Sequence, residues 1–263
     1  AEGEEMTGED IMRAAWKQSA IDANCRPEDF CSGHNRVVVS EANGKARKYL
    51  ELPAYCMLVS YGSNIVASVD SSIAGEVEEY LERFRIGHCF GTPNIYLLNE
   101  LFARDNRQIC FMAEYFLPDR ERLRALPCGY EIKILNPQDL HPFYQPQWDN
   151  ALSRSRKELD VLAAGAFYGT KLVGLAGCSA DCDSMWQIGV DVLPAYRRQG
   201  IASALTSRLA LECLDRGKIP FYCAAWANLQ SVRNAIRSGF GPAWVEVDAR
   251  PAAFIKEING EAL

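Results

Sequence analysis

The stretch "VDVLPAYRRQGIASAL", Val190 to Leu205, decides the interpretation of this chain. An apolar run ends at Pro194 and an alanine-rich segment starts near Ile201, an order that predicts a strand, a short loop and a helix. The first N–H groups of a helix lack backbone partners and lie at the positive end of its dipole. Because the loop also carries two arginines and a glycine, we predict an anion-binding site there.

The segments on both sides of that stretch predict a mixed sheet covered by helices. Strands are expected over 130–135, 159–168, 171–179, 185–193, 220–226 and 243–249, and helices over 201–216 and 228–238. Tyr168-Gly169-Thr170 predicts a hairpin, and the helices end before Gly217 and Gly239. An antiparallel meander followed by alternating strands and helices is an α/β fold with three layers, α/β/α.

The first half of the chain predicts a smaller mixed domain. Thr7 and Asp10 form a capping box for a helix, and two short strands are expected around the turn at 62–64. A helix follows from Ser71 or Ser72. The apolar run 108–116 predicts a strand covered on both faces, in which Glu114 is either a paired structural carboxylate or a substrate-binding group.

A proline-rich, charged segment separates the two halves. "LPDRERLRALPCGYE" interrupts the strand pattern, so we place an N-terminal α/β domain at 1–126 and a second domain at 127–263. The N-terminal domain is expected either to cover a substrate pocket or to mediate a homodimer. We predict the former, because clefts between domains commonly bind ligands.

Composition narrows the classes of partner. The formal charge of −6 and the lack of a basic cluster argue against nucleic acid. No apolar run of about 18 residues predicts a membrane span, and the amino terminus lacks the pattern of a secretory signal. The ten cysteines and three histidines show no zinc-like spacing, so we expect no metal and a cytoplasmic protein with reduced thiols.

Together with the later "FYCAAWANLQSVRNAIRSGF", the opening stretch resembles the GNAT superfamily of N-acetyltransferases. The signature loop of that family holds the pyrophosphate of acetyl-CoA, and the preceding strand pairs with its pantetheine arm. The resemblance implies acetyl-CoA as cosubstrate and a bulge at Gly189 that separates two strands. The cofactor-binding residues that it implies are Val190, Asp191, Val192, Arg197, Arg198, Gln199, Gly200, Ile201, Ala202, Asn228 and Ser231. The whole chain is similar to the subgroup of the zwittermicin A resistance acetyltransferase, which acetylates an amine-bearing antibiotic.

The sequence departs from the family where many members carry a tyrosine that protonates the leaving thiolate. Ala235 occupies that position. On the acceptor side, Asp181, Asp183 and Gln187 are candidates to attract a cationic amine, with turn formation as the alternative role of the two acids. Asp191 is the candidate base for the attacking amine.

Two functions from different classes follow. The first is acetyl-CoA-dependent transfer of an acetyl group to a primary amine of a small molecule, an antibiotic or a metabolite. The second is an acyl-CoA-binding sensor without catalysis on the same fold. Ala235 favours the sensor, whereas the phosphate loop suits both; a redox or metal protein ranks last.

Overall fold

The computed structural model describes residues 6–260, which form two compact units. Unit 1 contains the chain up to Ala15 and Tyr115–Pro242, and unit 2 contains Trp16–Glu114 and the chain from Ala243. The mixed α/β class expected from the sequence is confirmed. The boundary expected between residues 126 and 127 lies within unit 1, and that division stays a prediction.

Unit 1 is built on a mixed sheet in the strand order β4-β9-β8-β7-β6-β5. The pairs β5–β6, β6–β7 and β7–β8 are antiparallel, and the pair β8–β9 is parallel. The hairpin and the meander expected from the sequence are present. The strands are β4 (Arg107–Pro118, shared with unit 2), β5 (Glu131–Leu135), β6 (Asp160–Tyr168), β7 (Lys171–Ser179), β8 (Met185–Val192) and β9 (Ile219–Ala225).

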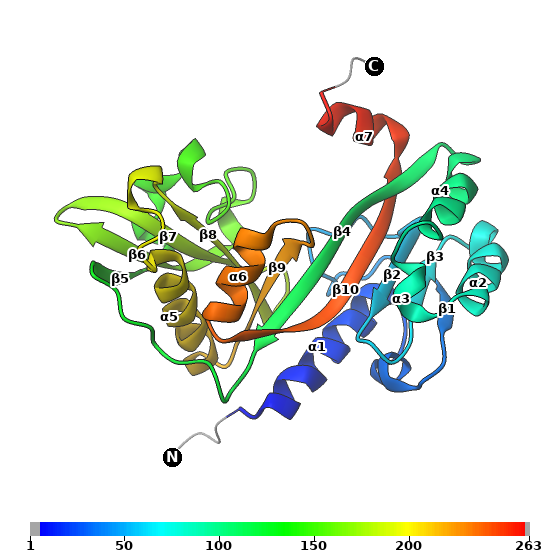
Figure 1. Ribbon diagram of the computed structural model, residues 1–263, viewed down its shortest axis with the longest axis horizontal. Coiled ribbons are helices and arrows are strands. Elements are labelled where there is room, and N and C mark those ends of the chain that lie inside the picture. The colour runs from blue at the N-terminus through cyan, green and yellow to red at the C-terminus, as the bar shows by residue number, and fades with distance from the viewer. Residues whose placement is uncertain (1–5, 261–263) are drawn as a thin grey trace. The chain divides into compact units, whose positions relative to one another are not determined.

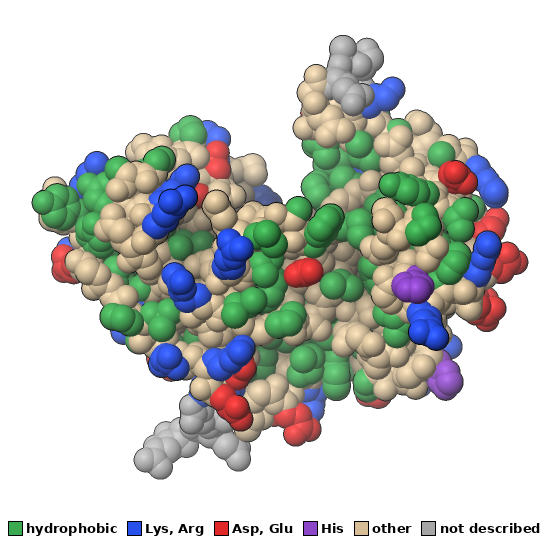
Figure 2. Space-filling view, in the orientation of Figure 1, with side chains coloured by type: hydrophobic (Ala, Val, Ile, Leu, Met, Phe, Trp, Pro, Cys, Tyr) green, Lys and Arg blue, Asp and Glu red, His purple; other side chains and the backbone are tan. Residues whose placement is uncertain are grey.

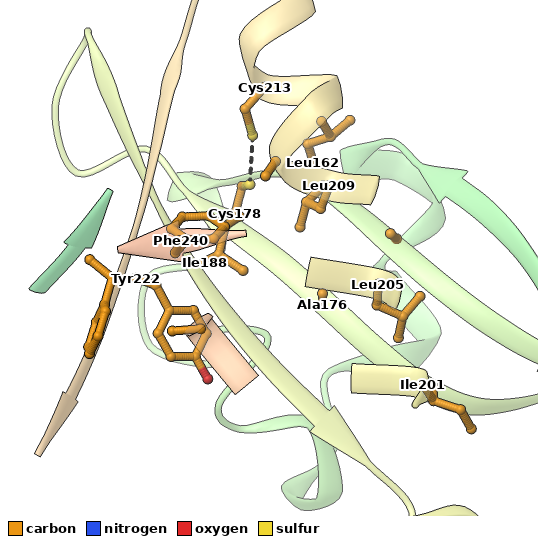
Figure 3. Close-up of a cluster of buried hydrophobic side chains, with 14 of the residues drawn as sticks. Leu162, Ala176, Cys178, Ile188, Ile201, Leu205, Leu209, Cys213, Tyr222 and Phe240 are labelled. Carbon is orange, nitrogen blue, oxygen red and sulfur yellow. Dashed lines mark hydrogen bonds between the residues drawn. The ribbon is translucent and has the colours of Figure 1, made fainter. Parts of the chain in front are cut away.

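Helices α5 (Ile201–Asp215) and α6 (Leu229–Arg237) cover one face of this sheet (Figure 1). Leu205, Leu209 and Cys213 recur at helical spacing and are fully buried against β6 and β7. The Sγ atoms of Cys213 and Cys178 on β7 lie 3.2 Å apart (Figure 3). Each buried leucine stabilises the fold by about 1.5–3 kcal/mol, so this core fixes where α5 begins.

The opposite face is covered by a segment of short 3₁₀ turns between β5 and β6. Gly177 and Gly189 are direct partners across β7 and β8, and added Cβ atoms there would lie 2.0 and 1.8 Å from the carbonyl oxygens of Ala151 and Asn150. The two glycines therefore let the segment lie against the backbone of the sheet. The turns are Pro137–Asp139, His141–Phe143, Pro146–Trp148 and Lys157–Leu159.

This contact corrects the interpretation of Gly189 as a bulge. The pairing of β7 with β8 runs from Gly174↔Val192 to Ser179↔Gln187 without a shift in register. Gly189 is thus explained by the close approach of Asn150, not by an extra residue in the strand.

In unit 2, the strands β1, β3, β2 and β10 are neighbours in that order. The strands are β1 (Arg36–Val39), β2 (Cys56–Ser60), β3 (Val66–Val69) and β10 (Phe240–Pro251), which begins in unit 1. The capping box of Thr7 and Asp10 is confirmed by the hydrogen bond from Asp10 N–H to Thr7 Oγ1, 3.2 Å. Helix α1 (Gly8–Ala23) begins in unit 1 and continues into unit 2 after Ala15. The other helices of unit 2 are α2 (Ala74–Arg83), α3 (Ile86–Cys89), α4 (Ile95–Ala103) and α7 (Ala252–Ile258).

The expectation that 108–116 is covered on both faces is wrong at Phe111. Its side chain is 56% exposed, and its φ of 54° interrupts the alternation of the strand. Among residues 6–260, no helix is long and apolar enough to cross a membrane.

Candidate active site

A cleft of about 800 Å³ lies in unit 1, where β8 ends and α5 begins. Its walls are the end of β8, the loop after it, the first turn of α5 and one face of α6. The lining residues are Asn150, Val190, Asp191, Val192, Tyr196, Arg197, Arg198, Gly200, Ile201, Ala202, Ser203, Tyr222, Asn228, Gln230, Ser231, Arg233, Asn234 and Arg237. All the predicted cofactor-binding residues except Gln199 are among them.

The loop between β8 and α5 has the geometry of an anion cradle. Gly200 is the N-cap residue of α5 with a left-handed φ of 79°, and no side chain caps the helix. Arg198 is also left-handed, with a φ of 63°. An added Cβ at Gly200 would meet no protein atom within 4 Å, so this backbone borders open space. The first N–H groups of α5 are therefore available to an anionic ligand.

Side chains around the loop hold it in place. Arg197 Nε donates to the carbonyl oxygen of Val192, 3.0 Å. Tyr130 donates its hydroxyl to Gln199 Oε1, 2.7 Å, and its ring contacts Tyr196 at 5.8 Å between centroids. Gln199 is thus held by Tyr130 and does not line the cleft, and the cofactor contact that the resemblance implies for it stays a prediction.

Helix α6 supplies the second wall. Asn228 is its N-cap, and the Oδ1 atom of that side chain accepts from Ser231 N–H, 3.2 Å. The Tyr222 hydroxyl on β9 lies 3.5 Å from Ser231 Oγ. Ala235 is completely buried in the core of unit 1, so α6 presents no phenol to the cleft at that position.

The strands that border the cleft separate where the pantetheine arm was expected. The parallel pairing of β8 with β9 covers only Met185↔Ile219 to Gln187↔Phe221, yet the strands continue to Val192 and Ala225. Beyond the last pair, the main chain of β8 has no partner on the β9 side within the described sheet. The backbone of β8 around Val190 is thereby available to an extended ligand, whereas the carbonyl oxygen of Val192 already accepts from Arg197.

Asp191 is engaged by the segment that covers the sheet. Its Oδ2 accepts from the N–H groups of Asn150 and Ala151, 2.9 and 3.0 Å, and its Oδ1 accepts from Asn150 Nδ2, 2.7 Å. Three donors to one carboxylate make it an anchor for residues 150–151. The catalytic role expected for Asp191 stays a prediction.

The predicted acceptor residues do not line the cleft. Asp181 is 1% exposed, forms an ion pair with Arg156 and accepts from Ser179 Oγ, 2.8 Å. Asp183 is exposed in the turn before β8. Gln187 Nε2 contacts Cys223 Sγ, 3.0 Å, beside the last pair of β8 and β9. The contacts of Asp181 favour a structural role for this residue. Of these three residues, only Gln187 lies where β8 and β9 separate.

Two further carboxylates, Glu114 and Asp160, lie outside the cleft lining. Glu114 is half-buried on β4 at the end of the first segment of unit 2. Asp160, which sequence reasoning missed, is 3% exposed, accepts from Ser153 N–H, 3.0 Å, and burial raises its pKa to about 6. Within residues 6–260, no group of three or more His, Cys, Asp or Glu side chains is placed to hold a metal ion.

Eight residues that line the cleft were not predicted as site residues, and four of them bear on its chemistry. Arg233 and Arg237 are one helical turn apart on α6, a spacing visible in the sequence. Tyr222 is 4% exposed, as is typical of a core residue, and it also lines the cleft. Asn150 comes from a segment whose path over the sheet has no local sequence signal.

The family model described as GNAT acetyltransferase matches residues 106–243. This match covers more than half of the chain and includes every strand and helix that borders the cleft. The chain belongs to the GNAT acetyltransferase family, as the resemblance in the sequence implied.

Several solved structures are similar to this chain at low sequence identity. A GCN5-related N-acetyltransferase-like protein from Streptococcus suis is 20% identical over 61% of this chain and 69% of its own, with a TM-score of 0.44. A Drosophila protein is 14% identical over 94% of this chain and 92% of its own, with a TM-score of 0.45. An aminoglycoside N-acetyltransferase in complex with CoA is 19% identical over 45% of this chain and 93% of its own, with a TM-score of 0.35. No curated protein matches the chain.

Proposed function

We propose that this protein transfers the acetyl group of acetyl-CoA to a primary amine of a small molecule. The observation that carries the proposal is the cleft in which an uncapped helix start, two arginines and a pair of separated strands meet. A pyrophosphate matches the loop, and an extended amide chain matches the free edge of β8. Membership of the GNAT acetyltransferase family supports this assignment.

The residues of the chain fit acetyl-CoA in charge and shape. Arg197 and Arg198 flank the start of α5, and Gly200 leaves its backbone open to close approach. The bound cofactor supplies an activated thioester. Positioned along β8, the thioester carbonyl is attacked by an uncharged amine; the C–N bond forms, the C–S bond breaks, and the amine proton leaves to a base or water.

Protonation of the leaving thiolate must come from elsewhere than position 235. Tyr222 supplies a phenol to the cleft, held near Ser231 at its hydroxyl. We propose Tyr222 or water as the proton donor. The Tyr222→Phe variant keeps the ring and removes only the hydroxyl, so it separates the two.

The test of cofactor binding is a thermal shift with acetyl-CoA. At about 100 times the dissociation constant, ligand binding adds about 2.7 kcal/mol to the free energy of unfolding. Gly200→Glu places a carboxylate in the cradle and should abolish the shift. Gly217→Glu is the matched control, because Gly217 also has a positive φ of 69° and open space around it but follows the far end of α5. A shift that survives in Gly200→Glu would overturn the assignment of the loop.

A second candidate, an acyl-CoA-binding sensor without catalysis, is favoured by one observation. The buried Ala235 removes the phenol that many family members use. Release of CoA thiol in the presence of a panel of amines distinguishes the two functions. Binding with no release for any amine would support the sensor.

The acceptor is proposed as a small molecule, in the chemical class of amine-bearing antibiotics or metabolites. The resemblance to the zwittermicin A resistance subgroup is the basis for placing antibiotics in the panel. A covering role for the N-terminal part of the chain, a homodimer and a cytoplasmic location stay proposals. Kinetics across the amine panel and the mass in solution test the first two.

A further inference from the structure

Helix α6 places two arginines on the wall of the cleft. Gln230, Arg233, Asn234 and Arg237 recur at intervals of three and four residues, so they share one face, and all four line the cleft. Arg233 and Arg237 are exposed, and no ion pair to either is found among the described residues. Figure 2 shows Lys and Arg side chains gathered over the surface where α5 and α6 lie in Figure 1.

This arrangement is unfavourable for the helix alone. Like charges four residues apart repel, and α6 contains no acidic residue to separate them. The helix dipole favours Arg237 in the last turn, but it does not favour Arg233 in the middle of the helix. The pair therefore suits a strongly charged anion in the cleft.

The pyrophosphate cannot be that anion by itself, because its cradle is already complete. The start of α5, Arg197 and Arg198 provide donors for a pyrophosphate diester, which carries about two negative charges. Arg233 and Arg237 add two further positive charges on a different wall. A dinucleotide-like ligand with only a pyrophosphate leaves them without a partner, whereas CoA carries one more anionic group, the 3′-phosphate of its ribose.

We infer that Arg233 and Arg237 bind the 3′-phosphate and select a free CoA thioester as the acyl donor. This inference rests on the proposed function and adds a specificity to it. A phosphomonoester presents three oxygens with about −1.5 to −2 charges, and the planar guanidinium groups match it through paired N–H donors. Acyl groups on phosphopantetheine alone, without the 3′-phosphate, are then poor donors.

The experiment compares the dissociation constants of acetyl-CoA and 3′-dephospho-acetyl-CoA by calorimetry at about 0.15 M salt. The wild-type protein is expected to prefer acetyl-CoA by about tenfold or more, because tenfold corresponds to about 1.4 kcal/mol and one hydrogen bond to a charged group contributes at least about that much. In the double variant Arg233→Gln/Arg237→Gln the preference falls to near one, while the affinity for the dephospho compound stays within about twofold because it lacks the contact.

Arg208→Gln is the matched control. Arg208 lies on α5, pairs with Glu212 at 3.0 Å and does not line the cleft, so this variant loses one charge from the same unit. It should keep the wild-type preference. Equal affinities of the wild type for the two compounds, or a preference that persists in the double variant or disappears in Arg208→Gln, would overturn the inference and leave acetyl-CoA binding intact. If neither compound binds the wild type, the proposed function itself fails.

Discussion

Replacing Asp191 by alanine tests whether this carboxylate is mainly an anchor for the segment over the sheet. The change removes the acceptor of three hydrogen bonds from Asn150 and Ala151. Asn150 is exposed, so its two donors regain water, whereas the N–H group of the buried Ala151 keeps a second acceptor, the carbonyl oxygen of Trp148, at 3.1 Å. The variant therefore removes three hydrogen bonds to a charged group without leaving the Ala151 donor unpaired.

The magnitude follows from these contacts. Hydrogen bonds to a charged group contribute about 1.5–3 kcal/mol each without being additive. Rehydration of Asn150 recovers part of this. We expect Asp191→Ala to lower the free energy of unfolding by about 1–2 kcal/mol.

Urea unfolding followed by tryptophan fluorescence measures the effect, because Trp148 in the same segment is buried. The midpoint should fall with an unchanged slope. Asp149→Ala is the matched control, since Asp149 forms an exposed ion pair with Arg154 that contributes about 0–1 kcal/mol. Equal losses in the two variants would refute the role of Asp191 as an anchor.

Three further predictions concern unit 1. Gly189→Ala should lower the unfolding midpoint, because its Cβ would lie 1.8 Å from the carbonyl oxygen of Asn150; an unchanged midpoint would show that the covering segment moves freely. Burial raises the pKa of Asp160 from its ordinary value to about 6, so the folded state binds this proton more tightly than the unfolded state does. The stability that the protonated side chain contributes is therefore present below about pH 4 and is lost as the pH rises to about 6. Asp160→Asn should remove that component, and parallel curves of unfolding free energy against pH for variant and wild type would contradict it. Tyr130→Phe frees Gln199 and should raise the dissociation constant of acetyl-CoA about two- to fivefold, the equivalent of about 0.5–1 kcal/mol for one partly exposed hydrogen bond, whereas no change in titration calorimetry would show that the loop needs no such support.

The sequence predicted the parts of unit 1 that depend on local signals. Strand β8, the loop and α5 follow from an apolar run, a proline and a glycine that are neighbours in the chain. The β6–β7 hairpin follows likewise from Gly169, which adopts a positive φ of 60°. Such features need no knowledge of distant contacts.

Non-local contacts explain what the sequence did not predict. Gly189 has the same chemistry as a bulge glycine, but its neighbour Asn150 is set by a segment that crosses from another part of the chain. Asp181 resembles an exposed turn residue until Arg156 is placed beside it. Short elements such as β1 and α3 carry too few residues for a clear period.

The path of the chain between the two units has a consequence for biosynthesis. The sheet of unit 2 uses β2 early in the chain and β10 near its end, with Ser60 paired to Val245. All of Tyr115–Pro242, which contributes to unit 1, is synthesised between them. A growing chain can therefore assemble most of unit 1 before β2 of unit 2 receives its partner strand β10. Until β10 leaves the ribosome, β2 exposes an unpaired apolar edge to which a strand of another nascent chain can pair. We therefore expect this protein to be most prone to aggregation during its translation, before β10 has been synthesised.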